Sequence, residues 1–432
     1  MFKNGIITAM PQPHIHPSEL EIKDFQYDLP DNRIARFPLA ERDLSKLLIF
    51  KDGKISESVY RQLADQIPTD SLLLFNQAKV IHARLYFQKP TGGKLEVFCL
   101  EPDERYPDIT TAMAQEGEVY WRCLIKGAAK WKGSEALVLN IDFRDGSGKS
   151  VPLMATAEKI EKRDKDFILK IKWKAGSGAK LSFSELLHYA GQMPIPPYLK
   201  REAEASDEIR YQTIFAEKEG SVAAPTAALH FTPEVLRRLK EKNIDTERLT
   251  LHVGAGTFMP VKSEQMKGHE MHSEWIEVSH RLVRQLISHI RAGKKVIAVG
   301  TTSARTLESL YWIGVRMLRK EWTADSGIVV SQWYPYERLD EFSPLEALSA
   351  LAQYFERSGK ELLITKTQLI IAPGYAFKIF DGLITNFHQP ASTLLLMISA
   401  LVGAQWRQIY DYALDHDFRF LSYGDGCLLW RS

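Results

Sequence analysis

Two histidines and a glutamate that could act together lie within one short run of this chain. His269, His272 and Glu274 belong to the run HEMHSE. Histidine and carboxyl groups placed this close together can move a proton to or from a substrate near neutral pH. In an extended segment His272 and Glu274 would project to the same face, because side chains alternate along a strand. The run predicts a general acid–base site, and His230 and His252 are further candidates for the base.

The same run can be interpreted in two other ways. Two histidines and a carboxylate could form half of a metal site, but the spacing indicates no further ligand. Each histidine could also be a core residue that is satisfied by hydrogen bonds. Cys99, Cys123 and Cys427 are far apart and form no CxxC pair. We therefore expect no metal and no disulfide framework.

A glycine-rich segment predicts close approach of a ligand to the backbone. Gly254, Gly256 and Thr257 belong to the sequence VGAGTFMP. Pro260 opposes the helix that a dinucleotide-binding glycine loop must open, so this segment does not indicate that fold. The glycines instead suit a ligand that lies directly against the main chain.

A second segment has the composition of an anion site. Thr301, Thr302, Ser303 and Arg305 follow a short apolar strand and open a helix. Unpaired N–H groups at a helix start, together with hydroxyls and a guanidinium, suit a carboxylate or a phosphate. The alternative is an ordinary helix cap with Arg305 in a salt bridge.

The elements that must position these groups fall into two kinds. Residues 94–173 contain short runs with a period of two, separated by Gly, Asp and Ser, which is typical of a barrel. Elsewhere, helix-start signals at Ser182, Thr232, Ser279 and Ser343 alternate with strands predicted at 296–300 and 368–373. Residues 56–66 also have a helical pattern.

The sequence therefore predicts an α/β core domain with an inserted small all-β, barrel-like domain. We expect the core domain to comprise residues 23–90 and 180–432 and the insertion to comprise residues 91–179. Residues 1–22 are expected to form an extended N-terminal arm.

Composition adds bounds rather than a function. The chain has 432 residues with 56 basic and 54 acidic side chains, a net charge of +2. Contacts with a nucleic acid must therefore come from local placement of charge. No signal peptide is evident, and the apolar run at 394–404 is too short to span a bilayer and predicts a buried helix. We expect a cytoplasmic monomer.

Several long segments, in order along the chain, carry a resemblance to a known family. They include residues 211–232, 251–261, 269–275, 299–309 and 373–393, together with shorter motifs at 38–43 and 423–425. Together they resemble the signature segments of the S-adenosylmethionine:tRNA ribosyltransferase-isomerases. The resemblance extends from Asp24 to Asp425 and is weakest in the β-rich middle.

The resemblance implies a metal-free reaction in queuosine biosynthesis. The ribosyl unit of S-adenosylmethionine, the co-substrate, is transferred and isomerised onto an aminomethyl-deazaguanine at the wobble position of tRNA. The product is epoxyqueuosine, and adenine and methionine are released. The implied partner is the tRNA anticodon stem-loop.

The resemblance also suggests substrate-binding residues. Asp381, Asn386 and His388 could contact the adenine or the deazaguanine edge. Near the junction with the β-rich insertion, the basic residues could contact phosphates. A solvated charged edge is the alternative for them. Residues proposed for this junction are Asn76, Lys79, Arg84, Lys89 and Lys94.

The chain departs from the family pattern at one informative place. Gln77, Ala78 and Lys79 stand where the family usually has Asp, Thr and Arg. Lysine cannot reproduce the two-pronged hydrogen bonding of arginine, so the exchange alters chemistry. Smaller departures are Ala228, Gln389 and Ala391. Two alternatives follow: a paralogue that uses S-adenosylmethionine on a different RNA acceptor, or a catalytically silent RNA-binding relative.

Overall fold

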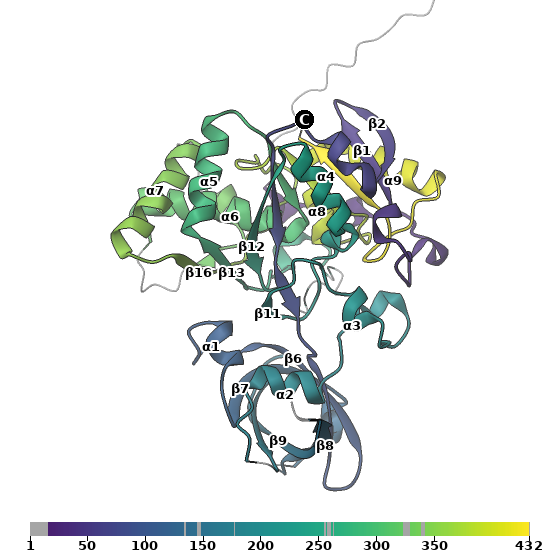
Figure 1. Ribbon diagram of the computed structural model, residues 1–432, viewed down its shortest axis with the longest axis vertical. Coiled ribbons are helices and arrows are strands. Elements are labelled where there is room, and N and C mark those ends of the chain that lie inside the picture. The colour runs from purple at the N-terminus through teal and green to yellow at the C-terminus, as the bar shows by residue number, and fades with distance from the viewer. Residues whose placement is uncertain are drawn as a thin grey trace, which may run out of the picture.

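The computed structural model describes residues 16–133, 135–144, 148–176, 178–254, 256, 261, 263–322, 329–337 and 342–431. Figure 1 shows a mixed α/β body and, below it, a separate closed barrel. This arrangement confirms the fold class that the sequence predicts.

The α/β body is built on a ten-stranded mixed sheet. Its central strands β12, β3, β14 and β17 are parallel to their neighbours in that series. β18 is antiparallel to β17, and β1 is parallel to β18. In spatial order the strands are β15 (Val329–Val330), β16 (Leu362–Thr367), β13 (Glu274–Ser279), β12 (Asp245–Leu251), β3 (Leu72–Asn76), β14 (Val296–Val299), β17 (Gly382–Asn386), β18 (Gly426–Trp430), β1 (Lys46–Lys51) and β2 (Lys54–Val59).

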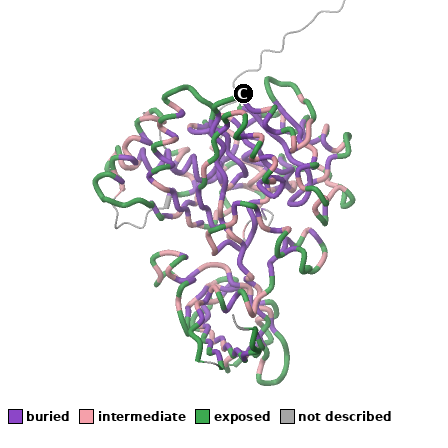
Figure 2. The backbone as a smooth tube through the Cα atoms, viewed as in Figure 1, coloured by how far each residue is buried: buried purple, intermediate pink, exposed green. Residues whose placement is uncertain are grey.

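Both faces of this sheet are covered. Along β3, Leu72 and Leu74 pack into one core cluster, and Leu73 and Phe75 pack into another. A central strand that is buried on both faces reads as a continuous apolar run, as this one does. The first face is covered by α5 (His280–Arg291), α6 (Thr301–Leu318), α7 (Pro344–Ser358), α8 (Thr393–Val402) and α9 (Trp406–Asp415), and the second by α4 (Pro233–Glu241) with the 3-10 helices Tyr60–Gln66 and Thr226–His230. In Figure 2 the interior of this body is predominantly buried.

The predicted helix starts are confirmed. The side chains of Ser182, Thr232, Ser279 and Ser343 each accept a hydrogen bond from a backbone N–H in the first turn of α2, α4, α5 and α7. Such caps satisfy donors that the helix itself leaves free. The apolar run at 394–404 coincides largely with the buried helix α8.

Two local predictions are wrong. Residues 56–66 contain the end of β2 followed by a 3-10 helix, because the first part of this segment pairs with β1. The strand predicted at 368–373 instead lies at Leu362–Thr367, where it pairs with β13. In both cases pairing with a neighbouring strand, which periodicity does not reveal, decides the local structure.

The barrel consists of six antiparallel strands. In spatial order they are β10 (Phe167–Ala175), β7 (Glu118–Lys126), β6 (Lys94–Pro102), β5 (Arg84–Gln88), β8 (Leu137–Arg144) and β9 (Ser150–Lys162). α1 (Ile109–Met113) and α2 (Phe183–Ala190) pack against the same core. The barrel runs from Arg84 to Ala175, whereas the division of the chain at residues 91 and 179 stays a prediction.

One edge of the large sheet is connected to the barrel. The carboxyl ends of β12, β3, β14 and β17 and the amino ends of β13, β18 and β1 meet there. From this edge the chain passes through β4 (Ala78–Val80), which pairs with β11 (Lys218–Ser221), and enters the barrel at β5. We call it the barrel-side edge. Ligands of open α/β sheets commonly bind at the carboxyl ends of the parallel strands.

Residues 16–22 of the expected N-terminal arm pack onto the α/β body. Pro17 is buried, and the Ile22 N–H donates to the backbone oxygen of Glu264 over 3.0 Å. The remainder of that arm, residues 1–15, lies outside the described residues.

Candidate active site

Most of the predicted site residues lie at the barrel-side edge. Thr301 to Ser303 open α6 directly after β14, Glu274 is the first residue of β13, and Asn386 ends β17. Gly254 follows the end of β12. The sheet topology therefore brings together segments that are far apart in the sequence, from Gly254 to Asn386.

At the centre of this edge Glu274 and Arg305 form a buried ion pair, with side-chain exposures of 7% and 9%. Arg305 Nε also donates to the Leu369 backbone oxygen over 3.1 Å. The Gly254 N–H donates to the second carboxylate oxygen of Glu274 over 3.1 Å. Each charge thus has an opposite partner and additional hydrogen bonds, which a buried ion pair requires.

Three polar atoms beside this pair lack partners. Arg305 Nη2, Thr302 Oγ1 and Ser303 Oγ are buried and form no hydrogen bond within the described protein. A buried polar atom without a partner costs about 1–3 kcal/mol, so such atoms rarely gather without a reason. The start of α6 therefore carries a guanidinium N–H and two hydroxyls that have no partner among the described residues, and their chemistry would fit a carboxylate.

The histidines of the HEMHSE run have surroundings different from those of Glu274. His272 is exposed, and His269 is half-buried. Burial, followed by the nearby His272, lowers the pKa of His269, which favours the neutral imidazole that a base requires. A Cβ built on Gly256 would lie 2.4 Å from His272 Cδ2, so this glycine lies directly against the His272 ring. Thr257, predicted to bind the same ligand, lies outside the described residues.

His252 belongs to a buried pair that the sequence did not reveal. Its Nε2 lies 3.2 Å from Oε1 of Glu277, and both side chains are almost fully buried. The other ring nitrogen of His252, Nδ1, is buried without a partner. The available signal was an acidic residue between two apolar ones, since Glu277 lies within β13 between Ile276 and Val278.

His230, Asn386 and His388 occupy the buried end of β17. Asn386 accepts a hydrogen bond from Thr226 Oγ1 over 2.8 Å, and its Nδ2 lies 3.4 Å from His230 Nε2. Burial lowers the pKa of His230 to about 4 and that of His388 to about 3. His388 Nε2 also lies 2.9 Å from Thr385 Oγ1. Both imidazoles are therefore neutral at physiological pH.

Two residues predicted to bind substrate are engaged elsewhere. Asp381 lies at the opposite edge of the sheet, where it pairs with Lys295 at 2.8 Å and accepts the Val296 N–H. Asn76 is at the barrel-side edge, but its side chain bonds both backbone groups of Leu251 and so joins β3 to β12. Neither side chain is free to bind a ligand beside Glu274 and Arg305. Asp381 lies at the wrong edge of the sheet, and the amide of Asn76 is already bonded to Leu251.

Two of the basic residues predicted at the junction, Lys79 and Arg84, form ion pairs within the protein. Lys79 Nζ lies 2.8 Å from Glu219, and Arg84 lies 2.8 Å from Glu96 within the barrel. These pairs are partly exposed and therefore weak. A phosphate could compete for either cation, and their contact with RNA stays a prediction.

The described residues set two further limits. Within them, no helix is long and apolar enough to cross a membrane. Nor do their His, Cys, Asp and Glu side chains form a group of three or more that could hold a metal ion.

The fold and the site define a two-domain α/β enzyme with buried acid–base groups at one sheet edge. Comparison with known proteins narrows this class: a family model described as queuosine biosynthesis protein matches residues 22–429. The chain belongs to this family, and it is a transferase–isomerase. The S-adenosylmethionine:tRNA ribosyltransferase-isomerase of Legionella pneumophila (strain Paris) is 37% identical over 410 residues, covering 94% of this chain and 99% of the relative.

Other relatives agree in name and extent. The protein of the same name from Trichlorobacter lovleyi is 36% identical over 414 residues, covering 94% of this chain and 99% of the relative. The crystal structure of an S-adenosylmethionine tRNA ribosyltransferase from Thermotoga maritima is 25% identical. It covers 94% of this chain and 99% of that chain, with a TM-score of 0.43.

Proposed function

We propose that this protein transfers and isomerises the ribosyl unit of S-adenosylmethionine onto the aminomethyl-deazaguanine wobble base of tRNA. Epoxyqueuosine forms, and adenine and methionine are released. Relatives named for this activity match nearly the whole chain at 36–37% identity. The observation that carries the proposal is the set of partnerless donors at the start of α6, Thr302, Ser303 and Arg305 Nη2.

These donors suit the carboxylate of S-adenosylmethionine. Glu274 already balances the charge of Arg305, so the carboxylate would be held by hydrogen bonds more than by net charge. Charge-assisted hydrogen bonds from a guanidinium remain stronger than neutral ones. Glu274 in turn places a negative charge near the same ligand, which favours its positive sulfonium.

The reaction needs a base for the proton on the carbon beside the sulfonium. His269 and His272 are our candidates, because His272 lies against Gly256 and is close enough to His269 to affect its pKa. Among the described residues, neither histidine is held in an ion pair. Glu274 suits this role less, because Arg305 and the Gly254 N–H occupy its carboxylate. Loss of adenine needs a proton donor at a ring nitrogen, and His252 with Glu277 is a suitable pair.

The altered triplet favours the usual acceptor over a different one. Gln77 Nε2 donates to Thr250 Oγ1 over 3.2 Å, Ala78 is buried within β4, and Lys79 pairs with Glu219. All three positions make contacts within the protein. The exchanged side chains therefore serve contacts within the protein, and we do not expect them to select a different substrate.

The direct test mixes the purified protein with S-adenosylmethionine and tRNA that carries the aminomethyl-deazaguanine. We expect adenine and methionine in equal amounts, with the ribosyl unit on the tRNA. tRNA with an unmodified guanine at that position is the matched control and should give neither product. Release of both products with the control RNA would instead support the paralogue, and no release with either RNA would support the silent relative.

A further inference from the structure

A second polar site lies at the barrel-side edge beside β1 and β18. It is a small cavity of about 10 Å³, which holds one water-sized atom. Segments at 38–43, 211–232 and 423–425, all of which carry the family resemblance, meet around it. The lining side chains include Leu39, Arg42, Arg210, His230, Ser422 and Tyr423.

Two arginines at this cavity, Arg42 and Arg210, join the two segments that carry them, because each donates to backbone oxygens of the other segment. Arg42 donates to the backbone oxygens of Gln212 over 3.0 Å and Ile209 over 2.9 Å. Arg210 donates to the backbone oxygens of Leu39 and Ala40. Burial and then the charge of Arg210 lower the pKa of Arg42, so the two positive charges are close. Arg210 Nε is buried and has no hydrogen-bond partner among the described residues.

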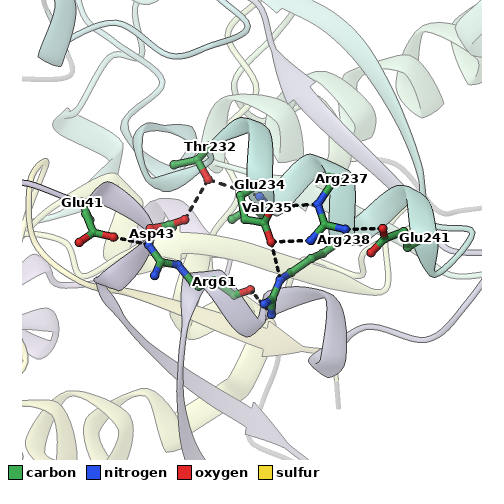
Figure 3. Close-up of polar contacts among 9 residues, drawn as sticks. All are labelled: Glu41, Asp43, Arg61, Thr232, Glu234, Val235, Arg237, Arg238 and Glu241. Atoms are coloured by element: carbon green, nitrogen blue, oxygen red, sulfur yellow. Dashed lines mark hydrogen bonds and ion pairs between the residues drawn. The ribbon is translucent and has the colours of Figure 1, made fainter.

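The nearest acidic side chain on the same segment is already neutralised. Asp43 is buried and accepts hydrogen bonds from Arg61 over 2.7 Å and from Thr232 Oγ1 over 2.9 Å. Figure 3 shows this network at the start of α4, with Glu41 also bound to Arg61. Asp43 therefore serves Arg61 and the helix cap, and its neighbour Arg42 is not part of the network.

Two buried acids near the other lining segments, Asp207 and Asp425, are also paired with arginines. Asp207 forms a two-pronged pair with Arg201 at 2.6 and 2.7 Å, and Asp425 pairs with Arg419 at 3.0 Å. Within the described part of the chain, no ion pair joins Arg42 or Arg210 to a carboxylate. Two adjacent cations without a counter-ion repel each other, and an oxyanion between them would remove that cost.

The cavity beside Arg42 and Arg210 is close to the start of α6. The 3-10 helix Thr226–His230 joins the two regions: a Cβ on Gly300 would lie 3.7 Å from Ala227 Cβ, and His230 lines the cavity. At about 2 Å rise per residue, Ala227 and His230 are separated by roughly 6 Å along that helix. An anion held by the two arginines would therefore lie beside the co-substrate rather than at a remote surface.

We infer that Arg42 and Arg210 together bind one backbone phosphate of the acceptor RNA and thereby position the wobble nucleotide at the reacting centre. The buried Arg210 Nε–H and the charges of both guanidinium groups suit a phosphate oxygen, and the cavity has room for one such atom. This inference rests on the proposed function, since it takes the RNA as the acceptor. Free phosphate has the same chemistry, and the experiments below separate the two sources.

The first experiment measures affinity for an anticodon stem-loop RNA, by fluorescence anisotropy, over a range of salt concentrations. For Arg42→Gln and for Arg210→Gln, we expect the slope of log K against log salt to fall in magnitude by about 0.7–0.9, the contribution of one phosphate. The double variant should fall no further, because both arginines hold the same phosphate. Arg357→Gln, on α7, is the matched control and should leave the slope unchanged. An unchanged slope in folded Arg42 and Arg210 variants would overturn the inference.

The second experiment needs no substitution, so a folding defect cannot obscure it. Phenylglyoxal labels accessible arginines, and mass spectrometry locates the label. The RNA should protect Arg42 and Arg210 but not Arg357, whereas inorganic phosphate at the same concentration should protect none of them. Equal labelling with and without RNA would contradict the inference, and equal protection by inorganic phosphate would assign the site to the free ion. Adenine release tests the proposed function separately, since RNA binding requires no turnover.

Discussion

Two arginine clusters lie at the same sheet edge. The positive charge of the first is balanced by a carboxylate within the protein, and the positive charge of the second is not. Arg305 is buried against Glu274, so the pair carries little net charge and has one guanidinium nitrogen left for a ligand. Among the described residues, Arg42 and Arg210 donate only to backbone oxygens, so no carboxylate there balances their charges. The difference suggests a division of labour. We expect the first cluster to bind the carboxylate of the co-substrate through oriented hydrogen bonds, and the second to bind an anion through charge.

The largest expected effect concerns the base at the first cluster. His272→Ala should reduce kcat by about 10²–10⁴-fold, the usual range for loss of a general base. Because His272 is exposed, the unfolding free energy and the affinity for S-adenosylmethionine should remain close to those of the unaltered protein. Glu270→Ala, an exposed neighbour in the same run, is the control. A near-normal kcat in folded His272→Ala would show that His272 is not the general base. His269 would then be the candidate to test in the same assay.

Breaking the ion pair should mainly reduce stability. Glu274→Ala leaves the Arg305 charge buried and unpaired, which typically costs 3–5 kcal/mol. The double variant Glu274→Met/Arg305→Met should recover most of the unfolding free energy in urea and still lack turnover. If the double variant is as unstable as the single one, the unpaired Arg305 charge is not the cause of the lost unfolding free energy.

The second cluster should make stability depend on pH through His230. Its pKa is about 4 in the folded protein, against an ordinary value near 6.5, because burial opposes the charged form. Between these values the unfolded chain binds more protons, so the unfolding free energy falls as the pH falls from about 6.5 to 4. The loss should reach about 3 kcal/mol. Urea unfolding at several pH values should show a shallower dependence for His230→Gln but not for the exposed His416→Gln. Equal slopes for both variants would contradict this assignment.

A smaller effect separates two neighbouring glycines. Gly256→Ala should displace the His272 ring, because a Cβ there would lie 2.4 Å from it. We expect kcat to fall by about tenfold, a change of about 1.4 kcal/mol in the activation barrier. Gly254→Ala is the matched control, since a Cβ there meets no atom of the described residues within 4 Å. Equal loss of activity in both variants would mean that the glycines act on the ligand rather than on His272.

The smallest expected effect concerns the altered triplet. Replacing Gln77, Ala78 and Lys79 by Asp, Thr and Arg should change kcat/KM for the precursor tRNA by less than about tenfold. The reason is that these side chains bond Thr250 and Glu219 rather than the open edge. A larger change would show that this segment does help to select the acceptor and would revive the paralogue alternative.

The sequence predicted what depends on local pattern. Period-two runs identified most of the barrel strands, and capping side chains at Ser182 and Ser343 marked helices that begin at the next residue. β5 was missed because its five residues precede the glycine turn that marked the insertion. Partners from distant segments could not be predicted, because they depend on sheet order.

The candidate site illustrates the same limit. The HEMHSE run and the start of α6 identified side chains that do meet at one edge. That Arg305 would pair with Glu274, and His252 with Glu277, depends on which strands are neighbours. Asp381 shows the converse: it belongs to a signature segment but lies at the far edge, because the strand β17 separates it from Asn386.

The most direct test of the two-cluster account is a crystal structure of the protein with S-adenosylmethionine and a precursor anticodon stem-loop RNA. The account predicts the methionine carboxylate against Thr302, Ser303 and Arg305 Nη2, and one RNA phosphate between Arg42 and Arg210. The wobble base would lie between them, within reach of His272. Density for either ligand at the opposite edge of the sheet, near Asp381, would contradict the account. So would a bound RNA whose phosphates all lie away from both arginines.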